Sequence, residues 1–202
     1  MTSPGLAVAP AAAMLRRANG GAALDQPAPA DTASAAWKDA VFAALEAAEV
    51  TQVHYVPDAG HATLIARAHA HPRMRAVPLT TEEEGVAACV GAWLGGARAV
   101  LLMQSSGVGN CINMLSLVRN CGAPFLTLVT MRGEWAEFNP WQVPMGRATP
   151  AVLEAMGVAV QRVDRAEDAA ETVDAAAALA YGAGSAVAVL FSQRLIGRKG
   201  WK

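Results

Sequence analysis

The sequence predicts an α/β fold: an open parallel sheet of about six strands, covered by helices on both faces as a three-layer sandwich. The chain has 202 residues, enough for one domain with a sizeable core. Hydrophobic residues make up 53% of it and charged residues 16%. Short apolar runs alternate along the chain with stretches of helical spacing, and this alternation is typical of repeated βαβ units.

The first regular element is a helix from near Trp37, since Val41, Ala44, Leu45 and Ala48 recur at helical spacing. Apolar runs then predict strands at residues 52–56, 75–79, 98–103, 124–130, 158–163 and 186–191. Helices are expected between them, at about 61–69, 81–94, 109–119, 151–156 and 167–181. Right-handed crossovers place the carboxyl ends of all strands at one edge of the sheet, where ligands bind in such folds.

The chain divides by composition into a flexible tail, residues 1–36, and a folded domain, residues 37–202. The tail consists mostly of Ala, Pro and Gly with few larger apolar side chains. Such a segment cannot bury enough apolar surface to offset the entropy lost on ordering. We therefore expect an arm that is not part of the core.

Charge and cysteine content exclude several classes of function. The chain contains 16 Lys and Arg and 17 Asp and Glu, a net charge of −1. This charge provides no electrostatic attraction to nucleic acid or to an anionic membrane. No uninterrupted apolar run reaches the ~18 residues of a membrane span. The three cysteines are an odd number without CxxC spacing, which argues against a disulfide framework or a zinc site and favours the reducing cytoplasm.

Three acidic residues open the expected helix at 81–94. Thr80 or Thr81 followed by Glu83 or Glu84 is typical of a capping box, and acidic residues in a first turn complement the helix dipole. The residues that follow are nearly all small and apolar, so the helix should pack closely. One of the carboxylates could then face a buried cleft, with a raised pKa and a proton to share with a ligand nitrogen.

The segment Gln104-Ser-Ser-Gly-Val-Gly-Asn110 follows an apolar strand and opens a helix, where backbone N–H groups can approach a ligand. It fails as a dinucleotide-binding fingerprint, because Ile112 stands where a third Gly or Ala is needed. It also lacks the lysine of a P-loop. A tight strand-to-helix turn without a ligand is the structural alternative.

A long loop at about residues 132–147 carries two Trp, a Phe and two Pro. Long ordered loops are more often functional than not, and Trp and Arg are also enriched at interfaces, so we expect an interface combined with a site entrance. Among the histidines, His61 is the one placed for chemistry, after the turn that follows the first strand. His54 is expected in the core or at the sheet edge, and residues 194–202 as a solvated tail.

Four segments in this order resemble a known family: VPDAG at 56–60, TTEEEG before the small-residue helix, QSSGVGN at 104–110, and MRGEW…NPWQVPMG from 131 to 146. Over about Trp37 to Phe191 the chain resembles the pyrimidine-binding domain of thiamine diphosphate-dependent enzymes. Within them the likeness is greatest to the α-subunit family of sulfopyruvate decarboxylases and to the matching part of phosphonopyruvate decarboxylases.

The resemblance implies a role for single residues. In the family a glutamate, ten positions before an aromatic residue, hydrogen-bonds N1′ of the cofactor's aminopyrimidine ring. Trp93 is the aromatic here, which implies that Glu83 is catalytic, while its neighbours Glu82 and Glu84 remain alternatives. The residues implied to bind the cofactor are Pro57, Glu83, Gln104, Ser106, Gly107, Gly109 and Asn110. Ser105 departs from the QNSG that related decarboxylases often carry.

The implied activity is that of a carbon–carbon lyase, the decarboxylation of a 2-oxo acid. A carboxyl group that shares a proton with the ring nitrogen favours the tautomer in which the cofactor can lose its C2 proton. Family members hold the diphosphate through Mg²⁺ with a GDG motif and an Asn pair, and this chain contains neither. The resemblance therefore implies a hetero-oligomer whose β-type subunit supplies the metal site, with no metal ligands in this chain.

The substrate implied is a 2-oxo acid with a second anionic group, with sulfopyruvate first and phosphonopyruvate next. Arg132 is the candidate for binding that second group, and His61 and Gln142 are weaker ones. A thiamine-dependent decarboxylase or carboligase for a plain 2-oxo acid is a broader alternative. A non-catalytic regulatory subunit of the same fold and a nicotinamide-binding module are alternatives from other classes.

Overall fold

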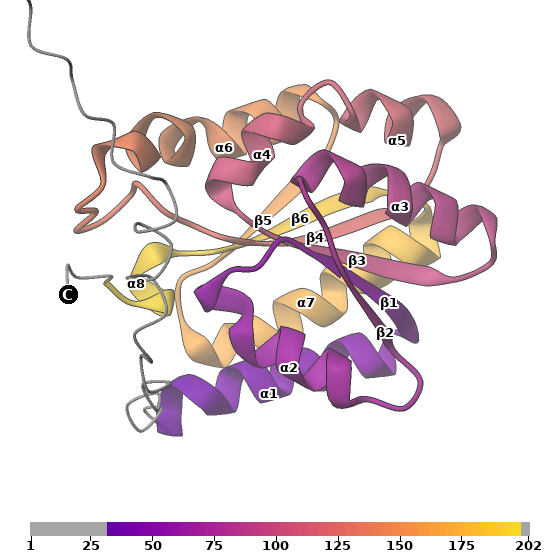
Figure 1. Ribbon diagram of the computed structural model, residues 1–202, viewed down its shortest axis with the longest axis horizontal. Helices are drawn as coiled ribbons and strands as arrows, with labels where there is room; N and C mark the ends of the chain where they lie inside the picture. Colours follow the sequence, from indigo (N-terminus) through magenta and orange to yellow (C-terminus); the bar gives the residue numbers. More distant parts are fainter. Residues whose placement is uncertain (1–31, 199–202) are drawn as a thin grey trace, which may run out of the picture. The chain divides into compact units, whose positions relative to one another are not determined.

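The computed structural model describes residues 32–198, which contain a six-stranded parallel sheet with helices on both faces (Figure 1). The strands are β1 (Val50–Tyr55), β2 (Arg75–Pro78), β3 (Arg98–Gln104), β4 (Phe125–Thr130), β5 (Ala159–Val163) and β6 (Ala186–Phe191). Their order across the sheet is β2-β1-β3-β4-β6-β5, with every pairing parallel. The expected fold class is confirmed.

The helices form two layers. Below the sheet in Figure 1 lie α1 (Thr32–Ala47), α2 (Ala62–Ala70) and α7 (Ala169–Ala177). Above it lie α3 (Glu82–Leu94), α4 (Ser105–Cys111), α5 (Leu115–Cys121) and α6 (Val143–Ala155). A last short helix, α8 (Gln193–Ile196), follows β6. Within residues 32–198, no helix combines the length and the hydropathy that crossing a membrane requires.

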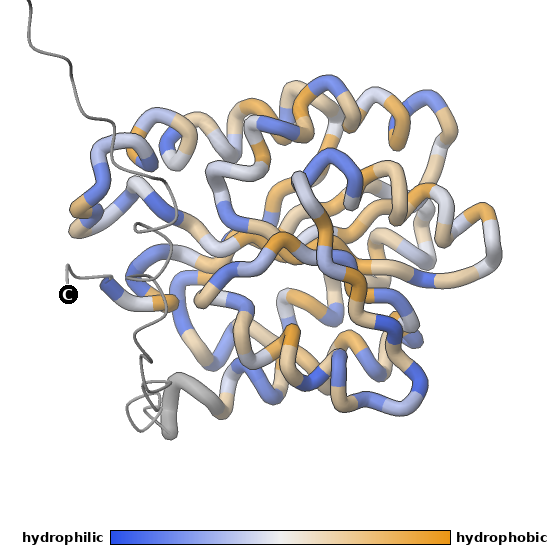
Figure 2. The backbone as a smooth tube through the Cα atoms, viewed as in Figure 1, coloured by the Kyte–Doolittle hydropathy of each residue, from blue (hydrophilic) through white to orange (hydrophobic). Residues whose placement is uncertain are grey.

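Two apolar cores lie on either side of the sheet, and the central strands serve both. In β3, Val100 and Leu102 belong to the lower core, while Leu101 and Met103 belong to the upper one. A strand buried on both faces reads as a continuous apolar run, which is why β3, β4 and β6 are evident in the sequence. Figure 2 shows these hydrophobic strands in the middle of the described chain.

Several boundaries differ from those expected. The first helix begins at Thr32, so the expected boundary between tail and domain after residue 36 falls inside α1. Residues 1–31 of the expected tail, and residues 199–202 of the expected C-terminal tail, lie outside the described residues.

The helix expected at 109–119 is two helices, since α4 begins four residues earlier, directly after β3, and α5 ends at Gly122 in the left-handed region (φ 60°). The helix expected at 151–156 starts at Val143. Pro144 suits a first turn, and Pro150 is accommodated inside the helix instead of starting it.

His54 is buried in β1 with 4% of its surface exposed. Its flanking residues Val53 and Tyr55 face the lower core, so the imidazole faces the upper layer. Neither ring nitrogen has a hydrogen-bond partner among the described residues. Burial lowers the pKa of His54, and the positive charge of Arg75 lowers it further.

We expect Gly85→Ala and Gly91→Ala, both in α3, to change stability in opposite directions. A Cβ at Gly85 would lie 2.3 Å from the Leu101 Cδ1 atom, whereas nothing lies within 4 Å of one at Gly91. Both substitutions gain about 1 kcal/mol of helix propensity, but overpacking at Gly85 costs roughly 1–3 kcal/mol. Chemical denaturation of the full chain should show Gly91→Ala stabilised and Gly85→Ala destabilised. Equal effects would contradict the close packing of α3 on β3.

We expect the chain to lose stability as the pH falls from about 7 to 5, partly through His54. The unfolded chain binds a proton there near pH 6.5, whereas the folded chain binds it only at a lower pH because its pKa is lowered, so acid favours unfolding. A single group of this kind contributes up to about 1.4 kcal/mol per pH unit. The difference in unfolding free energy between wild type and His54→Leu, measured at several pH values, isolates this contribution. A pH-independent difference would show that His54 titrates alike in both states.

Candidate active site

A crevice lies at the carboxyl ends of the neighbouring strands β1 and β3. The helices that follow these two strands lie on opposite faces of the sheet. The chain leaves β1 for α2 on the lower face and leaves the adjacent β3 for α4 on the upper face. In open α/β sheets ligands bind at such a switch point, outside the carboxyl ends of the strands. A cavity of about 190 Å³ opens here. It is lined by Val56, Pro57, Asp58, Glu82, Gln104 and Ser106.

Hydrogen bonds hold the polar side chains of this cavity in place. The Gln104 Nε2 donates to Asp58 Oδ1 at 3.1 Å, and the Ser106 hydroxyl donates to Gln104 Oε1 at 3.1 Å. Asp58 Oδ2 accepts from the Thr130 hydroxyl at 2.7 Å and from the Gly60 amide at 3.1 Å. The ends of β1, β3 and β4 are therefore joined through one carboxylate.

Glu82 lies against α4 at the other side of the cavity. Its Oε2 accepts a hydrogen bond from Asn110 Nδ2 at 2.8 Å. A Cβ on Gly107 would lie 2.3 Å from the Glu82 carboxyl carbon, so the carboxylate occupies space that any other residue at 107 would fill. The glycine of the QSSGVGN segment thus provides room for an acidic side chain, not for a phosphate group.

The three glutamates of α3 differ in orientation because of helical phase. Glu82 lies one turn before Gly85 and Val86, which are buried, so it faces inward. Glu83 is exposed and is not among the residues that line the cavity. Glu84 accepts from the amide of Thr80 at 2.9 Å, one residue before the N-cap Thr81, so this bond is not the one that defines the expected capping box. The Thr81 side chain makes no cap bond.

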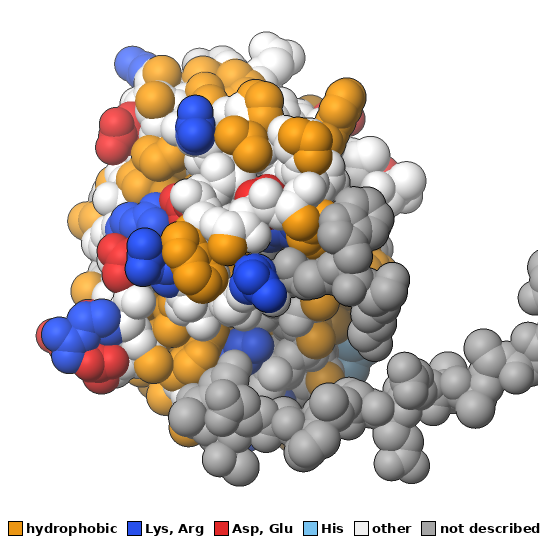
Figure 3. All heavy atoms as spheres, turned by 90° about the vertical axis from the view of Figure 1, so that its left-hand side faces the viewer, with side chains coloured by type: hydrophobic (Ala, Val, Ile, Leu, Met, Phe, Trp, Pro, Cys, Tyr) orange, Lys and Arg blue, Asp and Glu red, His pale blue; other side chains and the backbone are white. Residues whose placement is uncertain are grey.

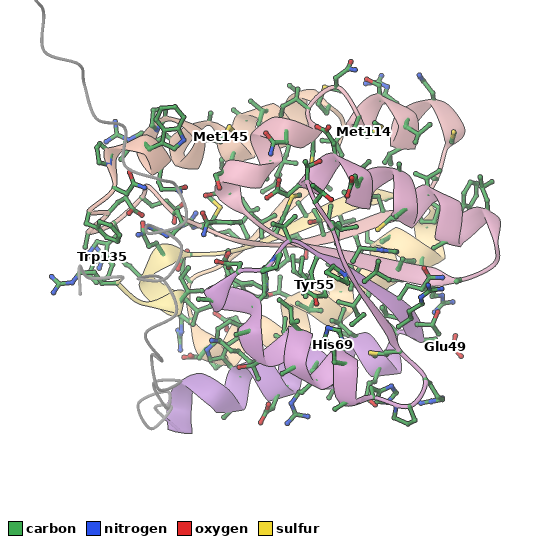
Figure 4. The ribbon with its side chains drawn as sticks, in the orientation of Figure 1. Glu49, Tyr55, His69, Met114, Trp135 and Met145 are labelled. Carbon is green, nitrogen blue, oxygen red and sulfur yellow. The ribbon has the colours of Figure 1, made fainter. Side chains whose placement is uncertain are left out.

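Gly109 and Met145 join α4 to α6. A Cβ on Gly109 would lie 3.1 Å from the Met145 Sδ atom. Met145 points from α6 toward α4 in Figure 4. Both glycines of the QSSGVGN segment therefore serve close packing, Gly107 against Glu82 and Gly109 against Met145.

Arg132 is not a free cation. Its side chain is 6% exposed, and it binds Glu137 through Nε (2.6 Å) and Nη2 (2.5 Å). This ion pair is the main reason why the pKa of Glu137 is lowered to about 2, so the pair stays ionised at neutral pH. Glu137 therefore neutralises the guanidinium within this chain, and a role of Arg132 in binding a second anionic group stays a prediction.

The other two substrate candidates lie in different surroundings. His61 is 1% exposed, its Nε2 is 3.2 Å from the Met103 carbonyl oxygen, and its ring packs against Phe191. Burial lowers the pKa of His61, and its role as a substrate-binding residue stays a prediction. Gln142 lies at the start of α6, and its buried Oε1 has no hydrogen-bond partner among the described residues.

Sequence reasoning missed three residues that organise this edge of the sheet. Asp58 stands in the quoted VPDAG motif, and an Asp two residues before a Gly is a recognisable turn signal. Thr130 and Gln193 carry no such signal, since their partners lie 72 and 56 residues away along the chain. Figure 3 shows the face onto which these strand ends open, with apolar, basic and acidic side chains side by side.

Comparison with known proteins gives several relatives, although no protein-family model matches the chain. A sulfopyruvate decarboxylase subunit alpha from Methanothermobacter thermautotrophicus is 34% identical over 153 residues, covering 75% of this chain and 93% of that protein. The protein of the same name from Methanococcus maripaludis is 38% identical over 121 residues, or 59% and 72% of the two chains. A phosphonopyruvate decarboxylase from Streptomyces viridochromogenes is 36% identical over 116 residues, 56% of this chain and 29% of that protein.

A solved structure with a similar fold is 2-oxoglutarate:ferredoxin oxidoreductase from Magnetococcus marinus, with a TM-score of 0.62 and 16% identity. The match covers 82% of this chain and 33% of that one, and it supports the α/β fold alone. The alignment with the Methanothermobacter protein, at 34% identity, covers 93% of that subunit. The chain therefore belongs to the family of sulfopyruvate decarboxylase α subunits.

Proposed function

We propose that this chain is the pyrimidine-binding subunit of a thiamine diphosphate-dependent decarboxylase, which converts sulfopyruvate to sulfoacetaldehyde and CO₂ together with a β-type subunit. The observation that carries the proposal is the Glu82 carboxylate at the switch-point crevice, held between Gly107 and Asn110. A carboxylate at this position meets a ligand at the carboxyl ends of β1 and β3.

The residues present fit one end of the cofactor. Glu82 is a carboxylate that can hold a proton at a ring nitrogen, and Asn110 fixes its orientation through a hydrogen bond. The remaining wall is formed by Val56, Pro57, Asp58, Gln104 and Ser106. The cavity of about 190 Å³ is smaller than the ~300–1,000 Å³ of complete small-molecule sites, as expected of a part-site that a second chain completes.

The residues present do not include a binding site for the diphosphate end of the cofactor. The sequence contains neither GDG nor an Asn pair, and no cluster of three or more potential metal ligands occurs in the described part of the chain. We therefore assign Mg²⁺ to the partner subunit and expect a hetero-oligomer. When bound, thiamine diphosphate supplies the electron sink for decarboxylation, and this chain contributes the acid, its orientation and part of the enclosure.

The choice of glutamate follows from the geometry of this chain. The resemblance assigned the acid to Glu83, which remains a prediction, whereas the cavity is lined by Glu82. Glu83 would need to meet the cofactor across the exposed side of α3. We favour Glu82 because its position is fixed before any partner binds.

The comparison supports sulfopyruvate over phosphonopyruvate, since the match covers 72–93% of three sulfopyruvate decarboxylase α subunits but only 28–29% of the phosphonopyruvate decarboxylases. Phosphonopyruvate decarboxylases are further relatives and define the second candidate substrate. Cys89, Cys111 and Cys121 are free thiols, which supports a reducing compartment, and we propose the cytoplasm.

We expect Glu82→Gln to lower decarboxylation by roughly 100-fold or more, because a positioned acid contributes about 10²–10⁴-fold. The variant keeps an acceptor for the Asn110 amide, so folding should be retained. Exchange of the cofactor's C2 proton, followed by NMR with the assembled complex, is the direct measurement.

Glu83→Gln and Glu84→Gln are the matched controls, one and two residues after Glu82 in the same helix turn. Both should retain most of the C2 exchange, with Glu84→Gln affecting stability through its bond to Thr80. Loss of C2-proton exchange in Glu83→Gln alone would show that Glu83, and not Glu82, is the catalytic acid. Full activity in all three variants would favour the non-catalytic subunit.

We expect a protein with a GDG…Asn-Asn pattern to co-purify with this chain and the pair to decarboxylate sulfopyruvate in preference to phosphonopyruvate and pyruvate. CO₂ release from each acid at equal concentration ranks the substrates. A preference for pyruvate would contradict the proposed substrate class but not the proposed cofactor.

A further inference from the structure

Both the oxygen and the nitrogen of the side-chain amide of Gln193, the first residue of α8, make hydrogen bonds. Gln193 is 1% exposed. Its Oε1 accepts from the backbone amides of Glu134 and Trp135, each at 3.0 Å, and its Nε2 donates to Glu137 Oε2 at 2.9 Å. One side chain after β6 therefore holds the loop of residues 133–142 that follows β4, called here the aromatic loop.

Two arginines complete this attachment. Arg132 binds Glu137 through two nitrogens, and Arg162, in β5, binds Glu134 through two nitrogens at 2.5 and 3.0 Å. The Gln193 backbone amide also donates to Glu134 at 3.2 Å. The aromatic loop is thus fixed to the ends of β4, β5 and β6 from its inner side.

The aromatic loop is held in a conformation that it would not adopt freely. Ala136 has φ 47°, a left-handed conformation that favours glycine. Glu137 accepts from the backbone amides of Gly133 and Asn139 on either side of it. Trp141, by contrast, is 83% exposed. Trp135, labelled in Figure 4, lies on the outer, left-hand side of the molecule in that view.

The base of the aromatic loop is bonded to the candidate active site. The Arg132 amide donates to the Ser105 hydroxyl at 3.0 Å, and Ser105 stands between Gln104 and Ser106, which line the cavity. Thr130, the last residue of β4, donates to Asp58 of the same cavity. A shift at the start of the loop would therefore move the wall of the cavity.

We infer that Gln193 is a positioning residue for the decarboxylase: by fixing the aromatic loop it sets the position of the cavity wall at Gln104–Ser106. The inference rests on the proposed function. Gln193 touches neither Glu82 nor the cavity, and its effect passes through Glu137, Arg132 and Ser105. Because Gln104 and Ser106 line the part of the cavity proposed to hold the cofactor, its loss should raise the KM for thiamine diphosphate, while C2-proton exchange at saturating cofactor stays unchanged.

Gln193→Glu tests this in the assembled complex, because the variant has the same shape and titrates. A protonated carboxyl can donate to Glu137 and accept from the two amides, as the native amide does. Once ionised, it loses the donor and faces the carboxylates of Glu134 and Glu137. Four other charged residues lie around it. Arg132 is paired with Glu137, and Arg162 is paired with Glu134 and Asp164. Arg194 lies over the ring of Trp135.

We expect the KM of Gln193→Glu for thiamine diphosphate to exceed that of wild type by roughly 10-fold at pH 8, which corresponds to a loss of about 1.4 kcal/mol of binding free energy. The excess should shrink as the pH is lowered to 6 and the carboxyl is protonated. Gln193→Leu should show the raised KM at every pH. Gln52→Glu, at the other end of β1, is the control and should follow wild type.

Hydrogen–deuterium exchange of the full chain gives a second test that does not depend on activity. The amides of Glu134 and Trp135 should be protected, and should lose protection in Gln193→Leu. Rapid exchange of these amides in wild type, or a KM ratio that is flat with pH in Gln193→Glu, would overturn the inference. A wild-type complex that decarboxylates no 2-oxo acid would instead refute the proposed function, while the exchange result still reports on the loop.

Discussion

The contact between the Glu82 carboxylate and the backbone of Gly107 is the constraint on which the candidate site depends. A side chain at residue 107 would collide with the carboxyl group, so α3 and α4 can approach only at a glycine. That approach places an acid at the carboxyl ends of β1 and β3, and Asn110 one turn away fixes its orientation. The small residues of α3 serve the same end, since Gly85 lets the helix lie against Leu101 of β3.

The sheet determines where polar chemistry can occur. Both faces of β3, β4 and β6 are apolar and covered, so the edge formed by the strand ends is where polar side chains gather. Hydrogen-bonded groups lie there around Asp58, around Glu82, and around Glu137 with Gln193. Two bonds from the end of β4 connect the last of these groups to the cavity: Thr130 donates to Asp58, and the Arg132 amide donates to Ser105. The candidate site and the aromatic loop thus share one framework.

The Arg132–Glu137 pair shows why charge in a sequence is a poor guide to ligand binding. An arginine after a strand at the ligand-binding edge is a reasonable receptor for an anion. Here the guanidinium is buried against a carboxylate five residues away and satisfies it at two oxygens. A buried ion pair of this kind adds little net stability but leaves a costly unpaired charge if one partner is removed. Its role is therefore to fix the shape of the loop.

The sequence by itself determined the fold class, the six strands and the segments that meet at the ligand-binding edge, because apolar periodicity and glycine turns are local signals. It also narrowed the acid to three adjacent glutamates. Tertiary structure decided which of them lines the cavity, since a rotation of about 100° per residue in a helix separates Glu82 from Glu83. It likewise decided that His61 is buried, that Arg132 is paired and that Gln193 holds the aromatic loop. His61 and Gln193 have partners 42 to 59 residues away, which no local pattern in the chain records. Glu137 is only five residues from Arg132, but their pairing depends on the folded conformation of the aromatic loop.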